Sequence, residues 1–233
     1  MKHSISVLLL TVAGISVGQS LDEIQYGAYI KSSKVMWDRS ISVADKNHGS
    51  ESFEKAMAMY GLLNSTMATK DEETFDDNVD QTVDLLKSII EEKPDWGEPK
   101  AVLSAIYGLV MAYSPMKGML YGSKSSSLVA DALKEQDDSP LVHKVAGGSK
   151  LYTPEMFGGN PEEAVKEFER AVSLYEKMGN VANNWLYLES LVNLSMAYKK
   201  TEKIAQAKKT LNKALKVEPE YGWAMSMLAS IDE

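Results

Sequence analysis

The spacing of its apolar residues is what most limits the fold of this 233-residue chain. From Leu21 to the C-terminus these residues recur every three or four positions, as on one face of a helix, whereas strand-like alternation is hard to find. Turn and cap residues interrupt the pattern at His48-Gly49-Ser50, Lys70 to Glu73, Pro94-Asp95, Ser114-Pro115, Asp138-Ser139-Pro140, Thr153 to Pro161, Gly179-Asn180, Lys200-Thr201 and Glu218-Pro219. We therefore expect an all-α protein of about ten helices, paired into hairpins.

The first twenty residues have the outline of a signal peptide. Lys2 precedes an apolar run from Ile5 to Val17, and the small residues Gly18 and Ser20 would suit cleavage after either of them. The run is shorter than the roughly 20 residues that cross a bilayer, which disfavours the alternative of an uncleaved anchor. We expect residues 1–20 to be removed and residues 21–233 to form one exported domain without stable membrane insertion.

Composition narrows the possible partners and chemistry. The net charge of −8 disfavours nucleic acid as a partner, and the absence of cysteine excludes disulfides and a lipid-modified N-terminal cysteine. After cleavage only His48 and His143 would remain as histidines, and neither lies in a catalytic or metal-binding motif. We expect no enzyme activity, no cofactor and no metal site.

Two charged segments have unremarkable explanations. Acidic residues dominate from Asp71 to Glu98, but Asp76 to Asp80 lacks the glycine and the closing glutamate of a calcium loop, so a solvated helix face is expected. Lysines dominate from Lys199 to Lys216, where a solvated face is again the first expectation. An acidic partner or an oligomer contact at these lysines is left open.

The C-terminal third carries a repeat pattern. Small residues at Ser195 and Ala207 would let two helices cross closely, and Pro219 would end the second helix. The full set of positions is Leu191, Leu194, Ser195, Tyr198, Ala207, Leu211, Ala214 and Pro219. This pattern resembles the tetratricopeptide repeat (TPR), with Leu191 in place of the usual Trp and Ser195 in place of the usual Gly. The resemblance implies a solenoid of helical hairpins that binds a protein or peptide in one long groove.

Two further copies of the pattern lie upstream. One contains Thr82, Leu86, Ile89 and Pro94, and the other contains Ala164, Phe168 and Ala171. Ala164 and Ala207 are further apart than the usual repeat period, which predicts longer helices between them. Residues 21–70 fit a repeat only by analogy, and the helix from Tyr221 to Ser230 is expected to cap the last repeat.

Two glycine-bearing inserts are the candidate binding site. The sequence SPMKGMLYGSKSSS follows Tyr113, and YTPEMFGGNP precedes Glu162. Insertions at equivalent turns of a solenoid emerge on one side, so we expect their aromatic and thioether side chains to lie near one another. These are Tyr113, Met116, Met119, Tyr121, Tyr152, Met156 and Phe157. The alternative is that they pack inside the protein, with Gly158 and Gly159 shaping a turn and not a phosphate site.

Resemblance to known proteins suggests two functions. The second insert resembles a segment of exported bacterial repeat proteins, which implies a periplasmic or secreted location. In length and repeat layout the chain also resembles the helical periplasmic TPR partner of TRAP-type solute transporters, although that family is often lipid-anchored. We expect a scaffold for a protein or peptide, and as an alternative a carrier of a small apolar or amphipathic ligand associated with a transporter; the 13 methionines suit the second.

Overall fold

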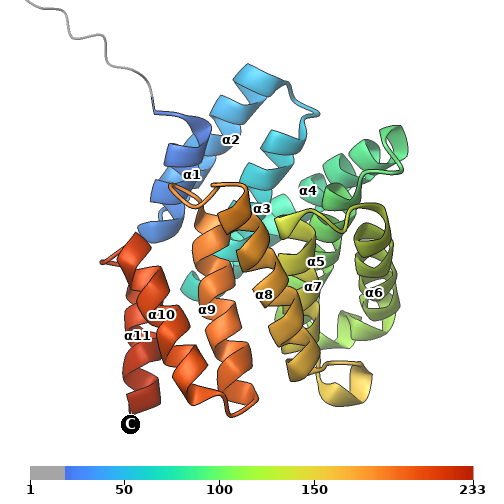
Figure 1. Cartoon of the computed structure of the whole chain (residues 1–233). Helices are drawn as coiled ribbons and strands as arrows, with labels where there is room; N and C mark the ends of the chain where they lie inside the picture. Colours follow the sequence, from blue (N-terminus) through green and yellow to red (C-terminus); the bar gives the residue numbers. More distant parts are fainter. Residues whose placement is uncertain (1–18, 233) are drawn as a thin grey trace, which may run out of the picture.

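The computed structural model describes residues 19–232, and over this range all of its regular secondary structure is helical (Figure 1). No strand occurs among the described residues, which confirms the expected all-α class. The helices are α1 (Leu21–Ile30), α2 (Lys34–His48), α3 (Phe53–Thr69), α4 (Glu72–Glu92), α5 (Gly97–Tyr113), η1 (Pro115–Lys117), α6 (Gly118–Glu135), α7 (Pro140–Tyr152), η2 (Glu155–Phe157), α8 (Pro161–Lys177), α9 (Trp185–Lys200), α10 (Ile204–Val217) and α11 (Gly222–Asp232).

Consecutive helices pack as antiparallel hairpins, and α11 packs on α10 as the expected terminal cap (Figure 1). Most helices begin and end at the breaks that the sequence predicts. The exception is the break at Lys31–Ser33, which separates α1 from α2 without a proline or glycine. There Ser32 adopts a left-handed φ of 47° and the Ser33 hydroxyl caps α2 by accepting a hydrogen bond from the Met36 amide.

The C-terminal hairpin has the predicted register. Ser195 on α9 and Ala207, Leu211 and Ala214 on α10 are completely buried, as small and apolar residues at a close helix crossing should be. The upstream copy behaves alike, since Ala164 and Phe168 on α8 are also completely buried. A Cβ on Gly147 of α7 would lie 2.9 Å from the Phe168 ring, so this hairpin too depends on a close approach.

The first helices of the hairpins form a closed ring. α1, α3, α5, α7 and α9 each pack on the next, and α1 also packs on α9. This closure corrects the expectation of one long open groove, because the faces that would have formed its floor are buried around aromatic rings. The Trp185 ring centroid lies 5.4 Å from those of Tyr29 and Trp37 and 5.9 Å from that of Tyr60. Burial of such large rings stabilises the closed form.

Two predictions concern the N-terminus and the membrane. Except for Gln19 and Ser20, the expected signal peptide lies outside the described residues, so its removal stays a prediction. Among residues 19–232 no helix combines the length and the apolar character that crossing a bilayer requires.

Candidate functional site

The two inserts connect the first and second helices of neighbouring hairpins, α5 to α6 and α7 to α8, and lie at the same end of the molecule (Figure 1). The first insert is shorter than the sequence suggested. Only Ser114 and η1 separate α5 from α6, because α6 begins at Gly118 and includes the serine-rich stretch. Tertiary contacts explain this, since the Ser125 hydroxyl on α6 hydrogen bonds with the Ser104 hydroxyl on α5 at 2.8 Å.

The second insert is a true turn, and its glycines shape it as expected. Gly158 has a φ of 97°, and a Cβ on Gly159 would lie 1.8 Å from the Thr153 carbonyl oxygen. The Asn160 side chain then caps α8 by accepting hydrogen bonds from the amides of Glu162 and Glu163. These residues have structural roles in the turn.

Four candidate side chains project into solvent. Met116 is 91% exposed and Met119 is 98% exposed at the first insert, and Met156 and Phe157 are 81% and 71% exposed at the second. Leu120, which the sequence analysis did not select, is also exposed. Apolar side chains this exposed contribute nothing to the core, so the alternative that they pack inside the protein is wrong for these four.

The three candidate tyrosines have contacts within the protein. Tyr113 donates a hydrogen bond to Thr66 Oγ1 on α3 at 2.9 Å, and Tyr121 lies 4.7 Å from the Tyr107 ring on α5. Tyr152 keeps an exposed ring but donates to Asn193 Oδ1 on α9 at 2.6 Å. Tyr113 and Tyr152 thus contact different helices, and the structure does not gather all seven candidates into one cluster of touching side chains.

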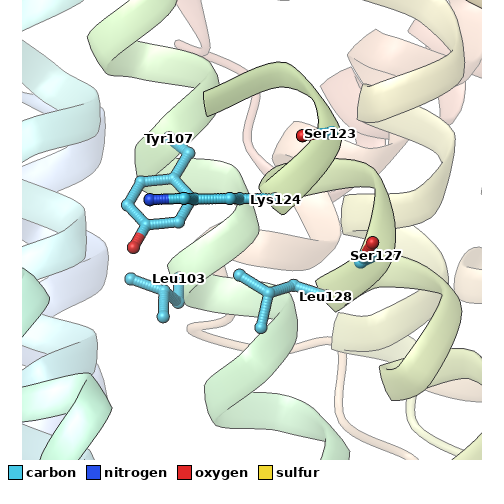
Figure 2. Close-up of a pocket in the computed structure, with 6 residues that line it drawn as sticks. All are labelled: Leu103, Tyr107, Ser123, Lys124, Ser127 and Leu128. Atoms are coloured by element: carbon cyan, nitrogen blue, oxygen red, sulfur yellow. The ribbon is translucent and has the colours of Figure 1, made fainter. Parts of the chain in front are cut away.

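Between α5 and α6 lies a shallow pocket with a volume of about 370 Å³. Its lining combines apolar and polar groups, namely Leu103, Tyr107, Ser123, Lys124, Ser127 and Leu128. Figure 2 shows Lys124 extending from α6 across Tyr107, with Leu103 and Leu128 below. Burial raises the pKa of the Tyr107 hydroxyl, which therefore stays protonated as a hydrogen-bond donor.

The sequence predicted a role for Tyr121, which neighbours this pocket, but for none of the residues that line it. A signal was present nonetheless, because residues 101–130 contain Lys117 and Lys124 and not one acid. In a chain with 33 acids such a stretch marks a locally cationic surface. An ammonium group beside two leucines suits an apolar ligand that carries a carboxylate.

A second, smaller pocket of about 240 Å³ lies beside the α7–α8 turn. Its cations are engaged within the protein: Lys150 pairs with Glu163 at 2.6 Å, and Lys200 donates to the Leu151 carbonyl oxygen at 2.9 Å. These two contacts therefore hold the α7–α8 turn in place against α9.

His143 on α7 is packed within the protein, and both of its ring nitrogens have partners. Its Nδ1 lies 2.6 Å from Glu167 Oε2 and its Nε2 lies 2.7 Å from the Asp137 carbonyl oxygen. Burial alone would lower the pKa of His143, but these two hydrogen bonds outweigh it and the pKa is raised. With both ring nitrogens engaged, His143 joins α7 to α8.

One buried ion pair lies where α3, α7 and α9 meet. Lys144 Nζ is 2.6 Å from Glu189 Oε2, and both side chains are almost fully buried. Asn64 donates to Glu189 Oε1 at 2.8 Å and the Tyr60 hydroxyl lies 3.4 Å from Lys144 Nζ. Burial alone would lower the pKa of Lys144, but the adjacent Glu189 charge outweighs burial and raises it, so the ammonium stays charged.

Residues 188–221 match the tetratricopeptide repeat family model, and they contain the C-terminal pattern described above. No curated protein sequence matches the chain significantly. Two solved structures share the fold over most of both chains. A thermophilic TPR protein from Thermus thermophilus superposes with a TM-score of 0.57 at 17% identity, covering 88% of this chain and 91% of that one. The HusA haemophore from Porphyromonas gingivalis superposes with a TM-score of 0.56 at 19% identity, covering 80% and 97%.

Proposed function

We propose that this TPR-like protein is an exported bacterial scaffold, periplasmic or secreted, that binds a protein or peptide partner and performs no catalysis. The observation that carries the proposal is the exposure of four apolar side chains in two inserts that lie at one end of the solenoid. We call Met116, Met119, Met156 and Phe157 the insert edge. Folds of this kind typically serve as protein-interaction scaffolds, and an unburied set of thioether and aromatic groups is typical of an adaptable contact surface.

The energetics favour a binding role over a structural one. Burying a Met or Phe side chain contributes about 1.5 to 3 kcal/mol, and the four side chains of the insert edge gain little of this in the free protein. A partner that covers them recovers that free energy. Aromatic residues near the centre of an interface often dominate binding, so Phe157 is the expected anchor at the second turn.

The test is a comparison of binding and stability in one double variant. Met116→Ser with Phe157→Ser should leave the melting temperature within a few degrees of the unmodified protein, because both side chains are exposed. Crosslinking in the periplasm of the native host, followed by mass spectrometry, should recover a partner with the unmodified protein and much less of it with the variant.

One control variant tests whether the effect is specific to the insert edge. Val35→Ser removes another exposed apolar residue, on α2 and away from the insert edge, and should leave partner recovery unchanged. Unchanged recovery with the double variant would eliminate the insert edge as the partner site, and a large loss of melting temperature would show that these side chains support the core.

A second candidate function is transport of a small amphipathic ligand in the α5–α6 pocket. Its support is the lining, which places Lys124 beside Leu103 and Leu128 in a pocket that is otherwise empty of charge. The similar fold of a haemophore makes haem, an apolar ring with carboxylates, a suitable probe. This candidate function is the alternative expected from the sequence, a carrier of a small amphipathic ligand associated with a transporter.

Thermal melting with haem and with a fatty acid tests this candidate. A carrier should melt at a higher temperature with one of the probes, by an amount that increases with ligand concentration, and Lys124→Met should remove much of the effect. Lys134→Met on the exposed surface of α6 is the matched control. Absence of any shift with either probe would count against the carrier function.

A further inference from the structure

α1 packs mainly on α2 and is also held by contacts with the C-terminal part of the chain. Tyr26 donates a hydrogen bond to Glu218 at 3.0 Å, and the Tyr29 and Tyr221 hydroxyls share another. On the same helix Ile24 and Ala28 are fully buried. α1 thus presents its apolar and tyrosine side chains to a surface formed by α2, α3, α9 and the residues before α11.

The attachment of α1 to the rest of the chain is weak in two ways. It is 10 residues long, and isolated helices shorter than about 12 to 15 residues are marginal in water, so its helical state depends on docking. The turn that joins it to α2 contains Ser32 at a φ of 47°, which is costly for a residue with a Cβ. Release of α1 would remove that strain and would break its packing on α2, α3 and α9, while the hairpins from α3 to α10 keep their own contacts.

The surface beneath α1 also contains a buried hydrogen-bond donor without an acceptor. The Trp37 indole lies against Trp185 at the centre of this region, fully buried, and its Nε1 has no hydrogen-bond acceptor within the described structure. A buried donor without a partner is destabilising, and the native docking of α1 leaves this cost uncompensated. Glu218 and Tyr221 supply polar contacts at the rim.

We propose that this surface is a helix-binding site, occupied within the chain by α1 and available to an amphipathic helix of a partner. The side chains of α1 define what the site accepts: apolar residues four positions apart, as at Ile24 and Ala28, with tyrosines at the positions of Tyr26 and Tyr29. Such helix-in-groove recognition needs only that the partner helix compete with α1. The site is separate from the insert edge and does not depend on it.

A peptide of residues 19–33 tests the proposal with the full chain. Ala28→Asp places a charge at a fully buried position of α1, so it should release α1 and leave the site intact. Tethering gives α1 a high effective concentration, so the fluorescein-labelled peptide should bind the Ala28→Asp chain about a hundredfold more tightly than the unmodified chain by fluorescence anisotropy. Ala130→Asp, at an exposed position on α6, should behave as the unmodified chain.

A control peptide with Ile24→Ser and Tyr29→Ser should not bind. The proposal is overturned if the Ala28→Asp chain keeps its helical circular dichroism but binds neither peptide, or binds both peptides alike. It is also overturned if the Ala28→Asp and Ala130→Asp chains bind the peptide equally.

Because Ala28→Asp could unfold the chain, a second measurement leaves α1 nearly unchanged. The chain has no cysteine, so Ala28→Cys and Ala197→Cys each introduce a single thiol at a fully buried position, on α1 and on α9. Under native conditions a thiol reagent should label Ala28→Cys at least tenfold faster, and excess peptide should speed this labelling further because it replaces α1. Equal labelling rates, or a rate that the peptide does not change, would refute the proposal.

Discussion

Tyr29 on α1 and Tyr221 before α11 share a hydrogen bond between their hydroxyl groups, although 192 residues separate them. Both rings also belong to the aromatic contacts around the closure, with centroids 5.8 Å apart. Burial is the main reason that the pKa of each hydroxyl is raised, so both stay protonated and one donates to the other. This pair joins the two ends of the solenoid.

Removing either hydroxyl should destabilise the protein. Tyr29→Phe or Tyr221→Phe leaves the other hydroxyl buried without its partner, at a cost of about 1 to 3 kcal/mol in the free energy of unfolding. Urea titration measures this cost. The double variant should lose less than the sum of the single variants, because it removes both polar groups. Additive losses would show that the two hydroxyls do not interact.

The Lys144–Glu189 pair should respond more strongly. Glu189→Gln leaves the Lys144 ammonium buried without a counter-charge and should reduce the free energy of unfolding by about 3 to 5 kcal/mol. Lys144→Met combined with Glu189→Gln removes both charges and still offers Asn64 an acceptor, so it should recover most of the stability. A double variant no more stable than Glu189→Gln would contradict this account.

The sequence contains local information about the fold, and this is why most helix boundaries were predictable. Proline, glycine and capping residues act on neighbouring backbone, and the breaks that contain them fall where expected. The break at Lys31–Ser33 lacked a proline or glycine because a serine takes the left-handed conformation there. The serine-rich start of α6 was assigned to a loop because its stabilising partner, Ser104, lies on another helix.

Ring closure and the division of the candidate site could not be predicted for a related reason. The contacts Tyr26 to Glu218 and Tyr29 to Tyr221 depend on accumulated curvature over the whole chain, which no local pattern encodes. Likewise the sequence grouped Tyr152 with Met156, but only the fold shows that Tyr152 bonds to Asn193 while Met156 projects into solvent.

The close crossing of α9 and α10 gives a test of the repeat register. Ala207 is completely buried, so Ala207→Trp must displace one helix and should reduce the free energy of unfolding by roughly 1 to 3 kcal/mol or more. Lys209→Trp, on the exposed side of α10, should change stability little. Thermal melting compares the two, and equal melting temperatures would show that the assigned register is wrong.

His143 should make stability depend on pH. Its pKa is higher in the folded protein than the ordinary value of 6.5, so its contribution is fully present below pH 6.5 and is lost as the pH rises through the folded pKa. Glu167→Gln removes the carboxylate that favours the charged ring. The stability difference between the unmodified protein and this variant, from urea titrations, should therefore be largest in mild acid and shrink at higher pH. A difference that grows with pH would contradict the role given to Glu167.

The N-terminus of α1 favours one of the two predicted cleavage positions. Ser20 Oγ accepts a hydrogen bond from the Glu23 amide at 3.2 Å, and Glu23 Oε2 accepts one from the Ser20 amide at 2.9 Å, which together form a capping box. Cleavage after Ser20 would remove this cap and leave a positive amino group at the positive end of the helix dipole. Cleavage after Gly18 keeps the cap and also keeps Gln19, whose Oε1 accepts a hydrogen bond from Arg39 at 3.2 Å.

We therefore predict that the chain is cleaved after Gly18 on export and begins at Gln19, as glutamine or its cyclised form, and intact-mass measurement decides this. Loss of the cap should cost about 0.5 to 2 kcal/mol, so Ser20→Ala in the mature protein should loosen α1 and increase labelling at Ala28→Cys. Asp22→Ala, on the exposed side of α1, is the control. A mature protein that begins at Leu21 would show that the capping box is dispensable, and an exported species that still contains Met1 would show that the N-terminal segment is not cleaved.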